Sequence, residues 1–192
     1  MNSRSLCLML FAVFVCADSL SVPVCGGVPR AEDSQKSAMR ARKIAPLLAA
    51  GVDVESDDAV IAVLSTVQDT GIVCGAIFLI KERQLRQAAP QLHDVLNSRS
   101  PLVVLEACDA LLKGLGDKED TIGRCAELLD DRDVIVRLRA AGLLAASGSF
   151  SGWRVVKDGM NDRNPAIVLE ASMVVGSFIR LEEQGKSDLG ND

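Results

Sequence analysis

The sequence predicts an all-α fold, an α-solenoid in which about four antiparallel helical pairs stack along the chain. Three observations lead to this prediction: one helical motif occurs four times, its copies start 31 to 33 residues apart, and aromatic residues are scarce. A period of this length is typical of solenoids built from helical pairs. With 3% aromatic residues and no tyrosine, the core must consist of aliphatic residues, which suits packed helices better than a β-sandwich.

The clearest copy of the motif lies in residues 132–148. Asp133 can cap a helix, because its carboxylate can accept hydrogen bonds from the free N–H groups of the first turn. Val136, Ala140 and Leu144 follow at helical spacing and fall on one face. That face is therefore predicted to be buried.

Three other segments repeat this order of cap, β-branched residue, alanine and aliphatic residue. They are Asp69, Ile72, Ala76 and Ile80; Ser100, Val103, Ala107 and Leu111; and Asn164, Ile167, Ala171 and Val175. The recurrent alanine has a physical reason: a helix that touches both its partner and the next repeat needs a small residue where the backbones approach.

Each of these second helices follows a predicted first helix. The first helices are residues 57–67, 89–96, 121–129 and 152–160. Within them Ile61, Leu92, Cys125 and Val156 each stand eleven residues before the β-branched motif position. Short polar links within each pair predict antiparallel neighbours. A further helix over residues 34–50 is expected to cover the N-terminal end of the stack.

The N-terminal residues are typical of a secretory signal peptide. A polar start with Arg4 precedes an apolar run and small residues, which predicts cleavage after Ala17 and a secreted or periplasmic protein. An uncleaved anchor and a lipoprotein acylated at Cys16 or Cys25 are the alternatives. The predicted organisation is a signal peptide (1–17), a flexible leader (18–33), a repeat domain (34–181) and a polar tail (182–192).

The charge and the cysteine pattern limit the kinds of ligand. A net charge of −5 argues against a nucleic-acid partner, which would favour a basic face. For Cys25, Cys74, Cys108 and Cys125 the alternatives are buried free thiols, one disulfide or a metal site. The apolar helical positions of Cys74, Cys108 and Cys125 favour free thiols. His93, the single histidine, is predicted to lie at the surface. We therefore predict no cofactor, no metal site and no catalytic residue.

Three segments carry a family resemblance. NSRSPLVVLEACDALLKGLGD, DDRDVIVRLRAAGLLAASG and NDRNPAIVLEASMVVGS resemble the second helices of short HEAT-like repeats, including those of the phycobilisome-lyase type. The resemblance covers residues 57–181 and implies a right-handed, armadillo-like α-solenoid. It also implies a surface that binds other proteins, because such repeats present extended faces.

These observations predict a protein-binding or assembly module rather than an enzyme. The alternatives are a chromophore-handling or other lyase of the same family and a structural subunit of an envelope complex. The residues expected to face a partner protein are Glu106, Asp109, Arg137, Arg139, Trp153 and Glu170. Charge reversal at Arg137 and Arg139 together is expected to weaken partner capture without unfolding the chain.

Overall fold

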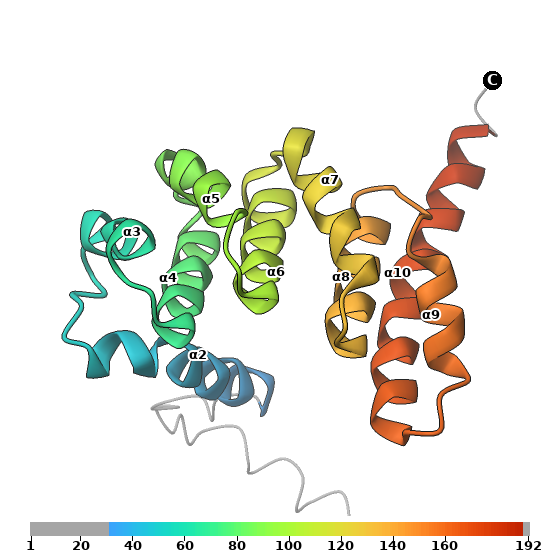
Figure 1. The fold of residues 1–192 in the computed structure, drawn as a ribbon, viewed down its shortest axis with the longest axis horizontal. Coiled ribbons are helices and arrows are strands. Elements are labelled where there is room, and N and C mark those ends of the chain that lie inside the picture. Colours follow the sequence, from blue (N-terminus) through green and yellow to red (C-terminus); the bar gives the residue numbers. More distant parts are fainter. Residues whose placement is uncertain (1–30, 190–192) are drawn as a thin grey trace, which may run out of the picture. The chain divides into compact units, whose positions relative to one another are not determined.

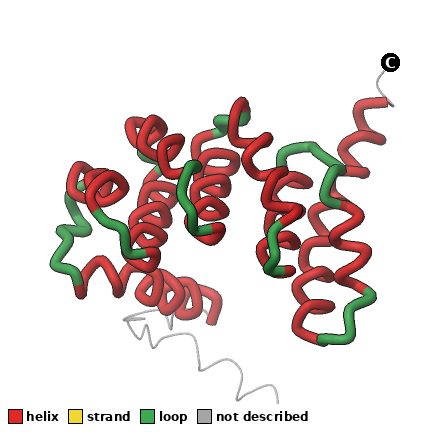
Figure 2. The backbone as a smooth tube through the Cα atoms, in the orientation of Figure 1, coloured by secondary structure: helices red, strands yellow, loops and turns green. Residues whose placement is uncertain are grey.

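The computed structural model describes residues 31–189, and within this range the chain is helical with no strand (Figures 1 and 2). Side-chain surroundings are described for residues 33–180 except residue 119. The chain divides into two compact units, residues 1–38 and residues 39–192. The predicted signal peptide and most of the predicted leader lie outside the described residues. The all-α prediction is confirmed.

The helices alternate between the predicted first and second positions. After α2 (Ala31–Ala49), the first helices are α3 (Asp57–Thr66), α5 (Ala89–Val95), α7 (Glu119–Glu127) and α9 (Trp153–Met160). The second helices are α4 (Thr70–Arg83), α6 (Pro101–Asp109), α8 (Val134–Ala146) and α10 (Pro165–Leu189). Three short turns, η1 (Arg86–Ala88), the π-helical η2 (Ala110–Leu115) and η3 (Leu128–Asp130), extend or join them.

Most of the apolar motif residues are buried as the sequence predicts, and Ile72, Ile167 and Val175 are half-buried. All four recurrent alanines are fully buried: Ala76, Ala107, Ala140 and Ala171. The first-helix residues that stand eleven positions earlier are also buried: Ile61, Leu92, Cys125 and Val156. Among the β-branched positions, Val103 and Val136 are buried, whereas Ile72 and Ile167 are half-buried.

Three of the four predicted helix caps form. Oδ1 of Asp69, Asp133 and Asn164 accepts a hydrogen bond from the backbone N–H two or three residues later, at 2.8–3.0 Å. Ser100 differs, because its side chain makes no capping bond. Its backbone N–H instead bonds the hydroxyl of Ser98 at 3.2 Å, which stabilises the turn before α6.

Each second helix contacts the next one along the chain (Figure 1). The helix α4 packs against α6, α6 against α8, and α8 against α10, and each also contacts the first helix that precedes it. At the N-terminal side of this series α2 packs against α4 at Gly75. A Cβ atom there would lie 2.8 Å from the carbonyl oxygen of Lys43, so only glycine allows this approach.

The buried core consists of two clusters that meet at α8. Val136, Ala140 and Leu144 belong to the larger cluster, which extends back to Ile44. Leu138, Ala141 and Ala145 belong to the smaller one, together with residues of α9 and α10. The helix α8 therefore buries one face against the preceding helices and the other against the following pair.

The last helix continues beyond the predicted end of the repeat domain. The sequence predicts a polar tail from residue 182 onwards, whereas α10 continues to Leu189. The segment after Leu181 contains no proline, and Glu182, Glu183, Gln184 and Lys186 are good helix formers, so it is compatible with a helix despite its polarity. None of the helices in the described part of the chain has both the length and the apolar character needed to cross a bilayer.

The buried alanine positions provide a test of packing. Replacing Ala140 by leucine is expected to lower the free energy of unfolding by about 1–3 kcal/mol, because a fully buried site has no room for three more carbon atoms. Chemical denaturation of the variant and of the parent protein measures this difference. Unchanged unfolding would show that Ala140 does not lie at a close contact between helices.

Candidate functional site

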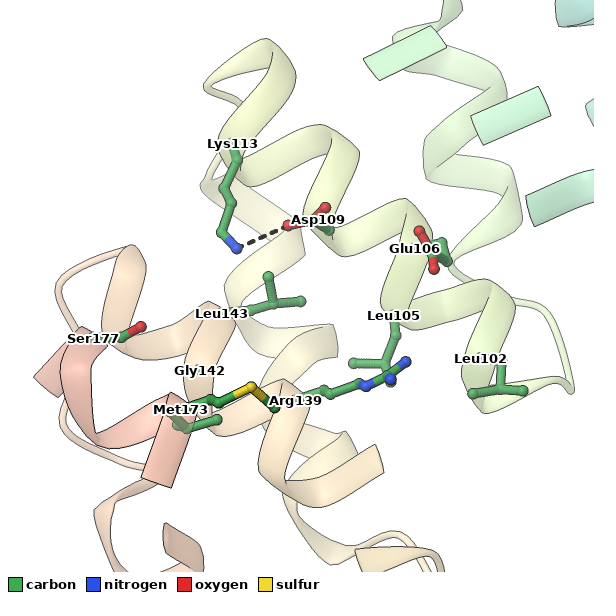
Figure 3. A pocket seen from close by; sticks show the side chains of 11 residues that line it. Leu102, Leu105, Glu106, Asp109, Lys113, Arg139, Gly142, Leu143, Met173 and Ser177 are labelled. Carbon is green, nitrogen blue, oxygen red and sulfur yellow. Dashed lines mark ion pairs between the residues drawn. The ribbon is translucent and has the colours of Figure 1, made fainter. Parts of the chain in front are cut away.

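A groove of about 280 Å³ opens where α6, α8 and α10 lie side by side (Figure 3). Side chains from the three helices and from the turn η2 surround it. The lining residues are Leu102, Leu105, Glu106, Asp109, Lys113, Arg139, Gly142, Leu143, Met173, Val174 and Ser177. The groove therefore combines an apolar interior with charged side chains.

The interior is apolar because buried aliphatic residues reach it from all three helices. Leu105, Leu143 and Val174 are each less than 10% exposed. Gly142 contributes no side chain between α8 and α10, which leaves space beside Leu143. A Cβ atom at Gly142 would lie 3.4 Å from both methyl carbons of Val174, an ordinary contact distance.

Two further apolar side chains at the groove are open to solvent. Leu102 on α6 is 47% exposed and Met173 on α10 is 60% exposed. Methionine adapts its shape to irregular partners and is common at surfaces that bind varied ligands. Their exposure gives the groove apolar area that the chain itself does not cover.

The acidic residues of α6 are paired with lysines from other elements. Glu106 Oε1 accepts a hydrogen bond from Lys43 Nζ of α2 at 2.7 Å. Asp109 pairs with Lys81 of α4 and with Lys113, whose Nζ lies 3.0 Å away. Lys113 belongs to the π-helical turn η2, so this turn brings a cation to the groove (Figure 3).

On the other side of the groove Arg139 of α8 pairs with Glu170 of α10, at 3.3 Å between Nε and Oε1. Among the described side chains, ion pairs thus join α4 to α6 and α8 to α10. None of the ion pairs among the described side chains joins α6 to α8, and the groove opens between these two helices.

The structure brings four of the six predicted partner-facing residues together. Glu106, Asp109 and Arg139 line the groove, and Glu170 pairs with Arg139 at its edge. The sequence predicted their shared surface from charge and helical position. It did not predict that they surround a hollow.

Arg137 has a different environment from Arg139. Its side chain turns to the loop before α8, where Nη1 donates hydrogen bonds to the carbonyl oxygens of Asp131 at 2.7 Å and Arg132 at 3.1 Å. These bonds stabilise the start of the helix. A charge reversal at Arg137 is therefore expected to disturb this loop, so Arg139 alone is the appropriate position for a binding test.

Trp153 lies on α9, outside the set of groove residues. Its ring packs against the ring of Phe178, with 5.3 Å between the ring centroids. The ring of Phe150 also packs against the ring of Phe178, with 5.9 Å between the centroids. Trp153 is nevertheless 45% exposed, so it contributes to both an aromatic cluster and the surface.

The sequence analysis did not single out Leu102, Gly142 or Met173. A usable signal was present, because Asp109, Gly142 and Met173 each stand nine residues after a motif cap. Comparing this position between copies shows an acid, a glycine and a methionine.

The three described cysteines are free. Burial and the nearby Glu106 raise the pKa of the Cys74 thiol to about 11, and Lys43 opposes part of this effect. A hydrogen bond with Cys108 and burial raise the pKa of Cys125. The thiols of Cys74 and Cys125 are thus poor nucleophiles. Cys25 lies outside the described residues.

His93 is half-buried and its Nε2 lies 2.9 Å from Asp117 Oδ2. It lies on α5, away from the groove, and links this helix to the loop before α7. In the described part of the chain no three histidine, cysteine, aspartate or glutamate residues are placed to hold a metal ion.

The ion pairs of Asp109 predict an acid dependence of stability. Burial alone would raise the pKa of this carboxyl, but hydrogen bonds and Coulomb attraction from Lys81 and Lys113 outweigh burial and hold the pKa below its ordinary value of 3.8. The ionised form therefore stabilises the folded state at neutral pH. This stabilisation is lost as the pH falls from about 4 through the lowered pKa. Denaturation of the parent protein and of Asp109→Asn between pH 2 and 7 measures this loss. Below about pH 4 the free energy of unfolding of the variant is expected to depend less on pH than that of the parent protein.

These features define the chain as an all-α protein with an amphipathic groove formed by its second helices. Comparisons with protein-family models, with curated proteins and with solved structures found no match.

Proposed function

We propose that this chain is an exported α-solenoid of about four HEAT-like helical pairs that acts as a protein-binding or assembly module. The 31- to 33-residue period and the contact of each second helix with the next support the solenoid. The sequence of residues 1–17 supports export. The groove between α6, α8 and α10 is the proposed binding site.

The observation that carries this proposal is the exposure of apolar side chains beside charged ones at a hollow. Leu102 and Met173 are about half-exposed, and buried leucines and a valine lie below them. Apolar surface that forms a concave patch with a polar rim is typical of interaction sites.

The groove predicts the chemistry of its partner. Because Glu106, Asp109 and Arg139 are already paired within the chain, a strongly charged ligand gains little there. We therefore assign the groove to a protein segment that inserts an apolar side chain between α6 and α8. Polar groups beside that side chain would face Glu106 on one wall and Arg139 on the other.

Site-specific photo-cross-linking tests this assignment. A benzophenone amino acid is placed at Met173 in the groove and, as a matched control, at Leu48 of α2, which is 54% exposed and outside the groove. We expect a discrete cross-linked partner from position 173 only, joined through a segment with an apolar side chain. Mass spectrometry of the product identifies that segment.

Two charge reversals complete the test. Arg139→Glu is expected to reduce the cross-linked product severalfold. Arg154→Glu, at a residue of α9 whose side chain is 92% exposed, should leave the yield unchanged. Equal products from positions 173 and 48, or turnover of a small substrate by the isolated protein, would contradict the proposed function.

A further inference from the structure

Two of the described cysteines lie in the core on neighbouring helices. Cys108 is on α6 and Cys125 is on α7, and both are fully buried in the larger core cluster. The helices α6 and α7 pack against each other. The sulfur of Cys125 lies 3.6 Å from the carbonyl oxygen of Ala140 on α8, so Cys125 is on the side of α7 that faces the second helices. The two thiols therefore lie in the same part of the core.

The repeat shows where α7 crosses α6. In the following repeat α9 crosses α8 closely, because a Cβ atom added to Gly152 would lie 2.6 Å from the Cα atom of Ala141. Cys108 corresponds to Ala141, since both stand eight residues after a motif cap. Thr121 corresponds to Gly152, and Thr121 is fully buried, as a residue at such a crossing must be. Cys125 follows Thr121 by one helical turn on the same face, so it lies beside the crossing.

The two thiols also interact directly. A hydrogen bond with Cys108 raises the pKa of Cys125 more than burial does. This contact and the close crossing of the two helices both indicate that the side chains face each other. A disulfide joins cysteines whose Cα atoms lie about 4.4–6.8 Å apart, so it can link two helices only at a crossing of this kind. The sequence favoured free thiols because it could not show that these two residues meet.

Cys74 has a different environment. It is half-buried on α4 and lines a cavity between α2 and α4, together with Lys43 and Gly75. Burial and Glu106 raise the pKa of its thiol, and no other cysteine contributes to this shift. Among the described cysteines, the pair that can be joined is therefore Cys108 and Cys125.

We propose that Cys108 and Cys125 form a disulfide that links α6 to α7 when the chain folds in an oxidising compartment. The oxidant is a small-molecule disulfide such as oxidised glutathione. One cysteine thiolate attacks it and releases one thiol, and the second cysteine thiolate then attacks the mixed disulfide and releases the other thiol. The two protein thiols lose two electrons and two protons in total, and the oxidant becomes two thiols.

Burial determines when this bond forms. In the folded chain neither sulfur is accessible to an oxidant, because both residues are fully buried. The bond therefore forms before α7 closes over α6, and folding then protects it from reduction. Its formation in the organism rests on the proposed export, because thiols in the cytosol stay reduced.

The disulfide would fix one wall of the groove. Leu105 and Asp109 of α6 line the groove, and Cys108 on the same helix faces α7 instead. The bond ties this wall to the following repeat and shortens the unfolded chain between residues 108 and 125. A loop of this length is long enough for a cross-link to stabilise the fold. We expect the oxidised chain to melt about 5–10 °C above the reduced chain.

Refolding of the full-length chain in a mixture of oxidised and reduced glutathione tests the pairing. After the remaining thiols are alkylated, trypsin releases Cys108 in the peptide of residues 100–113 and Cys125 in the peptide of residues 125–132. Mass spectrometry without reduction should find these two peptides linked in most of the refolded chain. Cys108→Ala should abolish the linked species, whereas the matched control Cys74→Ala should retain it.

Treatment of the folded, reduced chain with oxidised glutathione tests the order of events. We expect the linked peptides to appear at least about tenfold more slowly than during refolding, because oxidation has to wait for α7 to open. Thermal unfolding of the oxidised and reduced chains, followed by circular dichroism, measures the expected shift. Equal rates would contradict closure of α7 over the two thiols.

Three results would overturn the disulfide proposal. They are the absence of the linked peptides after refolding, a pairing of Cys108 or Cys125 with Cys25 or Cys74 instead, and equal melting temperatures of the oxidised and reduced chains. These measurements use the isolated chain and do not depend on export or on a partner protein. A chain that forms the bond on refolding, but that is isolated from its native cells with both thiols reduced, would contradict the proposed export and not the pairing.

Discussion

Leu144→Ala is expected to lower the free energy of unfolding by about 2–5 kcal/mol. Leu144 is fully buried on α8 and belongs to the larger core cluster, in which it lies beside residues from several helices. Truncation removes its apolar contacts and leaves a cavity that rigid neighbouring helices close only in part. Because the free energy of unfolding of a whole domain is small, the expected loss is a large share of it.

Leu48 provides the matched control for this experiment. It is also a leucine on a helix, but it is 54% exposed. Leu48→Ala should change the free energy of unfolding by less than about 0.5 kcal/mol. Urea denaturation of both variants gives the comparison. Equal effects at the two positions would show that α8 is not buried as described.

Gly152→Ala is expected to lower the free energy of unfolding by about 3 kcal/mol, at the upper end of overpacking effects. Gly152 is buried at the start of α9, and its added Cβ atom would lie 2.5 Å from Ala141 Cβ and 2.6 Å from Ala141 Cα. The second of these atoms belongs to the backbone of α8. The methyl group must therefore push α9 away from α8 rather than turn a side chain aside.

Gly123→Ala separates this steric effect from the intrinsic effect of adding a methyl group. Gly123 lies in α7 with nothing within 4 Å of an added Cβ atom. Alanine favours the helix there, so the variant is expected to gain up to about 1 kcal/mol. Opposite signs at the two glycines in thermal or urea unfolding would confirm the close contact. A neutral Gly152→Ala variant would contradict it.

Much of the helical architecture was predictable from one repeated pattern. Val136, Ala140 and Leu144 fall on one helical face, and a face of this kind must be buried wherever it occurs. The pattern located α4, α6, α8 and α10. The first helix of each pair was located by an apolar residue that stands eleven positions before the β-branched residue of the motif. Caps were less predictable, since Ser100 makes no capping bond.

The candidate site was predictable only in part. Sequence placed Glu106, Asp109, Arg139 and Glu170 on the second helices, which the structure confirms. It did not separate Arg139 from Arg137, although they are only two residues apart. A helix turns by about 200° over two residues, so one arginine reaches the groove edge while the other binds the loop before α8.

By itself, the sequence determined the helical content and most of the residues that become buried, because these depend on spacing along one chain. Only the tertiary structure decided that Leu105, Gly142 and Met173 meet at a groove. Helix periodicity specifies which face of a helix is apolar. Which neighbour covers that face, and how completely, depends on side-chain volumes contributed by segments far apart in the sequence.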